Sequence, residues 1–471
     1  MNLAEQLKPD AVFQAITQAA DALKVDTFVV GGHVRDLILK RPSKDIDVVC
    51  VGSGIQLAEK VASLLGPALR VHVFPNFGTA QIKYEDLEIE FVGARKESYR
   101  AESRKPIVEE GTLQDDQNRR DFTINAMGIR LNQAGYGDLV DPFDGLGDLR
   151  RKLIRTPLRP DLTFSDDPLR MMRAARFATQ LGFDIEPEAF DGMSAMSDRI
   201  RIISQERITE ELNKIILAKE PSYGFKLLYQ CGLLQLIFPE LVALQGVETM
   251  DGKGHKDNFY HTLQVLDNVA VRSDDLWLRW AAILHDIAKP ATKRFDKKAG
   301  WTFHGHEEKG ARMVPQLFRK LKLPLNEKMR FVQNLVRLHL RPIALSKEII
   351  TDAAMRRLLV ESGPDFEGLM ILCRADITSK NPDKVKRYLR NFDVLEQKLE
   401  ELEARDKLRE FQPVITGEII MTTFGLKPSR EVGIIKEAIR EAILEGIVPN
   451  EMAPAFAFMI EEGRKMGLSQ A

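Results

Sequence analysis

Short apolar runs, separated by glycines and helix-like stretches, mark the first 150 residues. Four runs carry the β-branched and aromatic residues typical of strands, and they cover residues 27–30, 45–51, 79–84 and 88–92. Because helical periodicity lies between them, the pattern predicts a mixed α/β head. The last two runs are close in sequence, which predicts a hairpin.

From about residue 165 onward, apolar positions follow the spacing of helices, as in residues 166–183 and 206–219. Residues 250–380 remain helical in pattern and hold six of the eight histidines. A charged helix at 395–410 follows, and a last zone from Phe411 ends in two predicted helices. The predicted fold class is α+β, a mixed α/β head followed by an all-helical body. The predicted domains are a head at 1–150, a helical neck at 151–250, a histidine-rich domain at 251–390 and a helical tail at 391–471.

Composition narrows the function classes. The 68 basic residues nearly balance the 69 acidic ones, so the chain does not coat nucleic acid through overall charge, although a local basic patch remains compatible with RNA. Three isolated cysteines form no CxxC pair, which argues against a disulfide framework or a structural zinc finger. No signal peptide or uncharged apolar span is present, and no feature indicates an obligate protein partner. We therefore expect a cytoplasmic protein without membrane contact.

A glycine turn precedes two aspartates in the head. The segment around Gly31 and Gly32 follows a predicted strand and starts a helix, a place where backbone N–H groups can face an anion. Asp45 and Asp47 are two apart on the next strand, so both carboxylates lie on one face. Two adjacent negative charges suit Mg²⁺. A solvated strand edge is the alternative for an isolated DxD pair.

The predicted hairpin offers a third carboxylate. Glu90 can share the face of Asp45 and Asp47, although Glu88 is the other choice on that strand. Three acids around two metal ions fit in-line nucleotidyl transfer, in which one ion activates a 3′-hydroxyl and the other holds the triphosphate. The sequence therefore predicts Asp45, Asp47 and Glu90 as the catalytic acids.

Several motifs in one order resemble a known family. They are GGHVRDLILKRPSKDIDVV at 31–49, RRDFTINAM at 119–127, DDPLRMMRAARF at 166–177 and SQERI at 204–208. Together they resemble the class of the polymerase-β superfamily that contains bacterial CCA-adding tRNA nucleotidyltransferases and poly(A) polymerases. The resemblance implies Mg²⁺ at Asp45 and Asp47. It also implies nucleotide binding by Gly31, Gly32, Arg35, Arg119, Arg120, Asp121, Asn125, Asp167, Arg170, Arg173 and Arg176.

Within these motifs, Arg119, Arg120 and Asp121 would face the ribose and the triphosphate, a task that suits the arginine fork. A charge cluster at a helix N-terminus is the alternative. Asp167 and Arg170 are three residues apart, so on one helix they would share a face. An intrahelical ion pair is the default interpretation of that spacing.

The functional interpretation is that Asp167 and Arg170 form a protein template. Cytosine and adenine each present an amino donor beside a ring-nitrogen acceptor, which a carboxylate and a guanidinium can read together. Uracil and guanine reverse that pattern, so CTP and ATP would be admitted and UTP and GTP rejected. The family usually has Glu where this chain has Asp166.

Two features favour CCA addition over the other activities of the family. Residues 72–80 resemble the CCA-adding form rather than the basic-aromatic stretch of poly(A) polymerases. The loop at 95–118, with Arg95, Tyr99, Arg100, Arg104 and Lys105, has the full length that CC-only enzymes lack. The expected substrates are CTP, ATP and the 3′ end of the tRNA acceptor arm. A poly(A) polymerase or an A-adding enzyme is the alternative.

The helical body offers candidate contacts to tRNA. A basic cluster suited to phosphates, or else an exposed linker, comprises Arg150, Arg151, Lys152, Arg155 and Arg159. Residues 415–421 and 427–429 resemble the tRNA-binding tail of the family, and a small helical cap is the alternative.

A second site is predicted in the histidine-rich domain. An adjacent His-Asp pair with His and Asp on other helices resembles the HD phosphohydrolase superfamily, which implies divalent ions such as Mn²⁺, Ni²⁺ or Mg²⁺ that activate water. The implied ligands are His261, His285, Asp286 and Asp376. His304, His306 and His339 follow, with His306 favoured over His304, and His255 is a candidate second-shell residue. The resemblance implies hydrolysis of phosphodiester or 2′,3′-cyclic phosphate ends, and the alternative is that this hydrolysis is the main activity.

Overall fold

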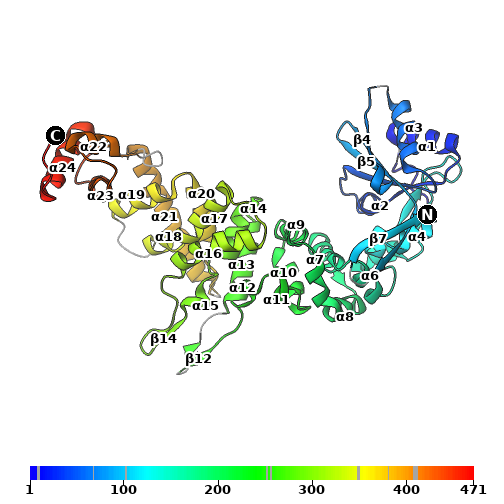
Figure 1. The fold of residues 1–471 in the computed structure, drawn as a ribbon. Helices are drawn as coiled ribbons and strands as arrows, with labels where there is room; N and C mark the ends of the chain where they lie inside the picture. The colour runs from blue at the N-terminus through cyan, green and yellow to red at the C-terminus, as the bar shows by residue number, and fades with distance from the viewer. Residues whose placement is uncertain are drawn as a thin grey trace. The chain divides into compact units, whose positions relative to one another are not determined.

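The computed structural model describes residues 1–7, 11–66, 68–100, 103–250, 253–254, 257–346, 351–379, 381–406 and 412–470. The chain forms two compact units, Met1–Val242 and Ala243–Ala471, which are described separately (Figure 1). An α/β head opens the first unit and helices make up most of the remainder, which confirms the predicted α+β class. None of the described helices is long and apolar enough to cross a bilayer.

The head is built on a seven-stranded sheet with the strand order β3-β4-β5-β2-β1-β8-β9. Its strands are β1 (Thr27–Val30), β2 (Asp45–Cys50), β3 (Val71–Phe74), β4 (Thr79–Tyr84), β5 (Leu87–Gly93), β8 (Gly128–Arg130) and β9 (Leu139–Val140). Within the described strands of this sheet, β2 and β5 pair in parallel and the other neighbours are antiparallel; the predicted hairpin is the antiparallel pair β4–β5. Helices α1 (Ala11–Leu23) and α3 (Gly54–Leu65) pack against each other beside this sheet (Figure 1).

A hairpin and a set of helices complete the first unit. The hairpin joins β6 (Arg95–Arg100) to β7 (Ser103–Glu110) between the sheet and the next helix. The helices after α1 and α3 include α2 (Gly32–Ile38), α4 (Leu113–Asn118), α5 (Gly145–Arg151), α6 (Pro160–Asp166), α7 (Leu169–Leu181), α8 (Pro187–Met196), α9 (Gln205–Ile216), α10 (Pro221–Gln230), α11 (Leu233–Ile237) and α12 (Pro239–Val242). A parallel bridge between β10 (Leu153–Ile154) and β11 (Asp184–Ile185) lies among them.

The helix predicted over 166–183 is interrupted at its start. Asp167 has an extended backbone with φ −137° and ψ 100°, so α6 ends at Asp166 and α7 begins at Leu169. The cause is Pro168, because a proline ring disfavours helical backbone in the residue before it. The expectation that Asp167 and Arg170 share a face of one helix is therefore wrong.

The second unit is a helical domain with a small separate tail. Its helices are α13 (Asn258–Ala270), α14 (Leu276–Leu284), α15 (Lys289–Thr292), α16 (His306–Lys320), α17 (Glu327–Leu338), α18 (Leu340–Leu345), α19 (Asp352–Ser362), α20 (Phe366–Ala375), α21 (Pro382–Asp406), α22 (Gly417–Phe424), α23 (Arg430–Leu444) and α24 (Met452–Lys465). The tail helices α22, α23 and α24 enclose their own apolar core around Ile420, Ile435 and Met459.

Two details of this unit differ from the sequence expectation. The region 250–380 is not helical throughout, because β14 (Arg294–Asp296) and β15 (Gly300–Thr302) form a hairpin and β12 (Thr249–Met250) pairs with β13 (Lys253–Gly254). The last zone also contains a third helix, α22, in addition to the two that were predicted.

Candidate active site and metal centre

Three carboxylates meet on neighbouring strands of the head. Asp47 of β2 stands opposite Glu90 of β5, while Asp45 pairs with Glu88. Asp45 and Asp47 both line one cavity, whereas Ile46 is buried, which confirms the predicted alternation of the strand. Burial, together with the charge of Asp45, raises the pKa of Asp47, although Arg120 opposes that rise.

The pKa of Glu90 is also raised, first by partial loss of solvent and then by the charge of Asp47. Carboxylates that raise one another's pKa are relieved by a cation between them. Oxygen donors from Asp45, Asp47 and Glu90 are of the type that Mg²⁺ prefers, so the donor chemistry fits this ion. The register thus brings Glu90, rather than Glu88, next to Asp47.

Gly31 allows two charged groups to approach the turn closely. It has a φ of 77°, and a Cβ atom there would lie 2.9 Å from Arg120 Nη1 and 3.4 Å from Asp47 Oδ2. Any side chain at this position would therefore meet Arg120 and strain the backbone. The predicted order of strand, glycine turn and helix start is confirmed by β1 and α2.

A cavity of about 280 Å³ gathers most of the predicted nucleotide-binding residues. Its predicted members are Gly31, Gly32, Arg35, Asp45, Asp47, Arg120, Asp121, Asn125, Arg173 and Arg176. Glu90, Arg119, Asp167 and Arg170 are not among the residues that line it. The cavity wall is strongly charged, as a site for a triphosphate and its metal ions requires.

A buried carboxylate that sequence reasoning missed holds the two arginines of the RRD motif. Asp116 is fully buried in α4 and forms ion pairs with Arg119 and Arg120, the latter at 3.0 Å. Arg119 and Arg120 follow the C-terminal end of α4, so the alternative of a charge cluster at a helix N-terminus is wrong. The spacing of three and four residues from Asp116 was the signal available in the sequence.

A second charged network supports the opposite wall of the cavity. Asp121 accepts hydrogen bonds from Arg173 Nε at 2.8 Å and from Asn125 Nδ2 at 3.0 Å. Arg35 Nη1 in turn donates to Asn125 Oδ1 at 2.8 Å. Burial alone would raise the pKa of Asp121, but Arg173 and these hydrogen bonds hold it at about 2.

Asp167 and Arg170 are three residues apart in the sequence, and their side chains have different partners. Arg170 Nη1 donates to the Thr163 carbonyl at 3.2 Å, and Nη2 donates to the Arg119 carbonyl at 2.5 Å. Asp167 Oδ1 accepts from the Leu169 N–H, and its other oxygen lies 3.9 Å from Arg207. The default interpretation of an ion pair within one helix is therefore wrong as well.

The basic cluster at 150–159 is partly neutralised by the fold. Arg151 and Arg155 both contact the fully buried Asp148, at 2.6 and 2.8 Å, and Arg151 also pairs with Asp144. Both acids precede the cluster in the sequence: Asp148 lies in α5, and Asp144 is the N-cap residue of that helix. The predicted cluster covered only residues 150–159 and so did not include them. Arg150 and Lys152 are exposed and remain candidates for phosphate contacts.

The second unit brings the histidines together around Asp286. On one side, His261 Nε2 and His285 Nε2 lie 3.5 and 3.2 Å from Asp286 Oδ2. On the other side, His306 Nε2 and His339 Nε2 lie 3.2 and 3.9 Å from Asp286 Oδ1. The described residues therefore contain two possible metal-binding triads that share one carboxylate.

Asp376 lies next to the first triad, which comprises His261, His285 and Asp286. Its Oδ1 lies 2.9 Å from His261 Nε2 and 3.7 Å from His285 Nε2. Although burial opposes ionisation, the bond from His261 and the charge of His285 hold the pKa of Asp376 at about 2. All four predicted ligands of this site thus lie together, and Lys289 adds a salt bridge of 2.6 Å to Asp286.

The imidazole rings are oriented as metal ligands require. His285, His306 and His339 each direct Nδ1 to the backbone carbonyl three residues earlier, at 2.7 Å. Their buried Nε2 atoms face the Asp286 carboxylate, and no well-formed hydrogen bond reaches them within the part of the chain that the structure describes. A hydrogen bond from one ring nitrogen to a backbone carbonyl leaves the other nitrogen available to a metal ion, so this donor set fits a divalent cation.

The two histidines of the β15–α16 turn differ in burial. His306 is buried beside Asp286, whereas His304 is exposed. Sequence reasoning did not include His306 and His339 in its ligand set, although both had been noted as following the His-Asp pair. Burial lowers the pKa of His339 to about 4, so its ring is neutral and able to bind a metal at neutral pH. His255 lies outside the described residues.

Three domain families match the chain. The "Poly A polymerase head domain" matches residues 27–155, the "Probable RNA and SrmB- binding site of polymerase A" matches residues 182–244, and the "HD domain" matches residues 258–381. The sheet with its carboxylates and the matched head domain together define a nucleotidyltransferase.

Relatives and solved structures specify the family. The A-adding tRNA nucleotidyltransferase of Deinococcus radiodurans is 33% identical over 70% of this chain and 75% of its own length. The multifunctional CCA protein of Nitrosococcus oceani is 33% identical over 76% of this chain and 86% of its own length. The chain belongs to the tRNA nucleotidyltransferase family, as its motifs predicted.

The fold is that of a solved CCA-adding enzyme. The Bacillus stearothermophilus CCA-adding enzyme in complex with CTP matches 98% of this chain and 99% of its own chain, with a TM-score of 0.66 and 22% identity.

Proposed function

We propose that the chain adds C, C and A to the 3′ end of tRNA from CTP and ATP. The observation that carries this proposal is the placement of Asp45, Asp47 and Glu90 on adjacent strands beside a charged cavity. Relatives named for CCA addition and a relative named for A addition are about equally similar to the chain. The β6–β7 hairpin, which occupies the loop that CC-only enzymes shorten, favours an enzyme that reaches the final A.

The residues of the cavity bind and orient the reactants. Arg120 lies beside Asp47 and the glycine turn, where its guanidinium can hold triphosphate oxygens. Arg173 and Arg35 are fixed by Asp121 and Asn125, so two further cations face the same space. Mg²⁺ held by the three carboxylates would supply activation of the 3′-hydroxyl and neutralisation of the phosphates.

Base selection is assigned to Asp167 and Arg170. Arg170 is held by the carbonyls of Thr163 and Arg119, which fixes the plane of its guanidinium. Asp167 stands outside the helix, where Oδ1 accepts from the Leu169 N–H at 3.1 Å and Oδ2 lies 3.9 Å from Arg207, so Oδ2 is the oxygen proposed to meet an amino group. Together they would present an acceptor and a donor to cytosine or adenine.

Incubation with tRNA that lacks CCA, together with Mg²⁺ and CTP, ATP or both, tests the proposal at single-nucleotide resolution. We expect growth by C, C and A followed by arrest. Asp47→Asn should abolish incorporation, while Asp86→Asn, at a 90% exposed side chain, should leave it unchanged. Growth only on tRNA that already ends in CC would make the chain an A-adding enzyme, and a ladder of A would make it a poly(A) polymerase.

A second activity is favoured by the two triads that share Asp286. We infer that the HD site binds Mn²⁺, Ni²⁺ or Mg²⁺ and hydrolyses phosphate or 2′,3′-cyclic phosphate ends, which would prepare damaged tRNA for repair. His261, His285, Asp286 and Asp376 would hold the first ion, and His306 and His339 join Asp286 around the second position. Loss of cyclic-phosphate hydrolysis in Asp286→Ala, with CCA addition retained, is the expected result; equal hydrolysis by Asp286→Ala would contradict the assignment.

A further inference from the structure

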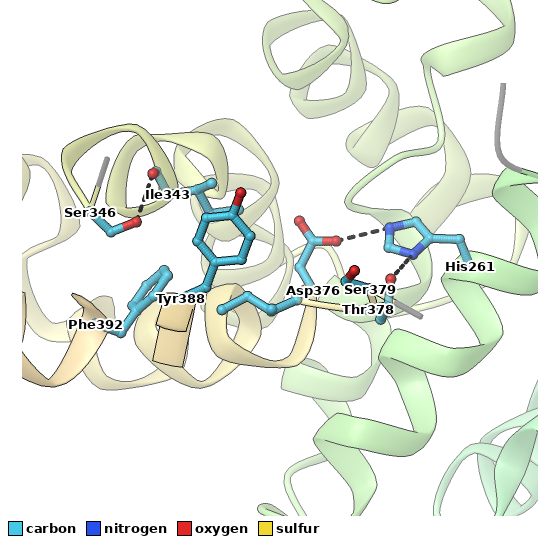
Figure 2. Close-up of a pocket in the computed structure, with 9 residues that line it drawn as sticks. His261, Ile343, Ser346, Asp376, Thr378, Ser379, Tyr388 and Phe392 are labelled. Carbon is cyan, nitrogen blue, oxygen red and sulfur yellow. Dashed lines mark hydrogen bonds and ion pairs between the residues drawn. The ribbon is translucent and has the colours of Figure 1, made fainter. Parts of the chain in front are cut away.

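A cavity of about 260 Å³ opens beside the HD site, within the second unit. It is lined at one end by His261 and Asp376, which belong to the metal centre. Figure 2 shows the ring of Tyr388 between the Asp376 carboxylate and the side chains of Ile343 and Phe392. The cavity therefore continues the metal centre away from the histidines and toward α21.

The two ends of this cavity differ in chemistry. The far end is formed by Ile343, Tyr388 and Phe392, with Ser346 beside Ile343 (Figure 2), and the Phe392 ring is fully buried and so fixed in place. A phosphate group alone would use only the polar end at Asp376. An aromatic and aliphatic wall next to a phosphate site is suited to a flat, weakly polar group attached to that phosphate.

Three hydroxyl groups of the cavity have partners within the protein, and one of them, Ser379 Oγ, accepts from the Asn381 N–H at 3.2 Å. Ser346 Oγ donates to the Ile343 carbonyl at 2.9 Å, and Thr378 Oγ1 lies 2.8 Å from His261 Nδ1 (Figure 2). The wall therefore offers contact area rather than a set of free polar groups that would read the edge of a base. Stacking on an aromatic ring accepts every base, because every base has a π-face.

We propose that Tyr388, backed by Ile343 and Phe392, forms a base-binding subsite of the HD site. It receives the nucleobase of a nucleoside phosphate ester while the ester lies at Asp376 and His261. The guanidinium carbon of Arg387 lies 5.4 Å from the Tyr388 ring centroid, and Arg387 is not among the residues that line the cavity. A cavity near the lower end of the usual range for ligand pockets, about 300 Å³ and above, suits one terminal nucleoside. This inference rests on the proposed HD activity and adds the group that this site recognises.

The test compares two five-membered cyclic phosphates, one that carries ribose and a base and one that carries neither. Uridine 2′,3′-cyclic phosphate and glycerol 1,2-cyclic phosphate are hydrolysed by the Mn²⁺-loaded full chain, and uridine is chosen because the head is proposed to reject uracil. Tyr388→Leu removes the ring and Tyr388→Phe keeps it. We expect Tyr388→Leu to raise KM for the uridine ester about tenfold, the effect of one lost stacking contact. Tyr388→Phe should change KM less than twofold, and neither variant should alter kcat/KM for the glycerol ester.

A binding measurement that does not depend on hydrolysis distinguishes the base-binding subsite from the proposed hydrolase activity of the HD site. Uridine alone, titrated by saturation-transfer NMR, should bind the wild-type chain and Tyr388→Phe but not Tyr388→Leu. Ring-dependent binding without any hydrolysis would overturn the hydrolase and support the subsite. Equal kcat/KM for both esters, unchanged in Tyr388→Leu, would overturn the subsite and leave the hydrolase.

The source of the nucleoside is distinguished in the same assay. An RNA oligonucleotide that ends in uridine 2′,3′-cyclic phosphate is compared with the mononucleotide. A tenfold effect of Tyr388→Leu on the RNA identifies RNA ends as the ligand, and an effect confined to the mononucleotide identifies free nucleotides; both support the subsite. CCA addition, which belongs to the head, should be equal in all variants, and an unchanged urea transition in tryptophan fluorescence shows that the second unit of each variant is folded.

Discussion

The guanidinium of Arg170 donates a hydrogen bond of 2.5 Å to the backbone carbonyl of Arg119. This bond joins the start of α7 to the RRD motif, whose side chains are held in turn by Asp116. The residue assigned to reading the base is therefore tied directly to the segment assigned to the triphosphate. A base that fits poorly would disturb both, which gives a physical route from base recognition to phosphate alignment.

Arg170→Lys is expected to impair both base recognition and the alignment of the triphosphate. A lysine carries one ammonium group, which cannot replace a planar fork that reaches the Thr163 and Arg119 carbonyls at once. A charged hydrogen bond contributes about 1.5–3 kcal/mol, so kcat/KM for CTP and ATP should fall at least tenfold. Steady-state incorporation of CTP, ATP and UTP measures the effect, and discrimination against UTP should weaken. Arg201→Lys, on an exposed arginine, serves as the control. An unchanged UTP discrimination would remove Arg170 from the template.

Glu90→Gln should lower CCA addition strongly, whereas Glu88→Gln should not. Both lie on β5, but only Glu90 stands opposite Asp47, while Glu88 faces Lys83. Removing one charge weakens the binding of Mg²⁺, so the Mg²⁺ concentration for half-maximal rate should rise about tenfold for Glu90→Gln. Titration of the rate against Mg²⁺ measures this shift. A Glu90→Gln enzyme with the Mg²⁺ dependence of the wild type would show that Glu90 does not supply the third carboxylate.

The sequence predicted local geometry well where one rule decided it. Period-two alternation placed Asp45 and Asp47 on one face of β2, and the order of the motifs placed the glycine turn beside them. The prediction was wrong where two local rules, helical spacing and the effect of a proline, opposed each other. Helical spacing put Asp167 and Arg170 on one face, but Pro168 ended the helix between them. The sequence contained that proline, so the break was predictable from it.

Contacts between residues that are far apart in the sequence could not be predicted from it either. Nothing in the local pattern shows that the Arg119 carbonyl accepts a bond from α7, or that Tyr388 of α21 stands beside Asp376. Likewise, the ligand set of the HD site needed burial to separate His306 from His304. These are tertiary facts, because they depend on which helix faces pack together.

Asp116→Asn is expected to weaken nucleotide binding, although the Asp116 side chain itself would not contact the nucleotide. Asp116 is a positioning residue, because it touches only Arg119 and Arg120 in the network described above. Its loss leaves two guanidinium groups without their buried partner, a change that costs about 3 kcal/mol of stability. KM for both nucleotides should rise more than kcat falls. Asp115→Asn, at the preceding residue of α4, should leave KM unchanged, although it weakens the helix N-cap. A fall in kcat with constant KM would contradict the positioning role.

His306→Ala should reduce the metal content of the second unit, and His304→Ala should not. His306 is buried with its Nε2 3.2 Å from Asp286, whereas His304 is exposed. If two ions share Asp286, the wild-type chain should retain up to two Mn²⁺ at saturation and His306→Ala only one. Atomic emission analysis after equilibrium dialysis gives the stoichiometry, with Asp45→Asn present in all samples to remove the head site. An equal Mn²⁺ content in both variants would exclude His306 as a ligand.

The stability of the head should depend on pH through Asp121. Its pKa in the folded chain is about 2, below the ordinary 3.8, because Arg173 and Asn125 outweigh the effect of burial. A depressed carboxyl pKa stabilises the fold above the unfolded pKa, and this contribution is lost as pH falls toward the folded pKa. The difference of nearly two pH units corresponds to roughly 2 kcal/mol at neutral pH.

Asp121→Asn should therefore be less stable than the wild type by roughly 2 kcal/mol at pH 7, and the gap should narrow by about 1 kcal/mol at pH 3. Urea unfolding followed by far-UV circular dichroism reports both units, whereas tryptophan fluorescence reports only the second, since all three tryptophans (Trp277, Trp280 and Trp301) lie there. Comparison of the two signals isolates the transition of the head. Asp161→Asn, at an exposed ion pair with Arg159, should show no such narrowing. A gap that stays constant between pH 7 and pH 3 would mean that Asp121 stabilises the head through hydrogen bonding and packing rather than through its charge.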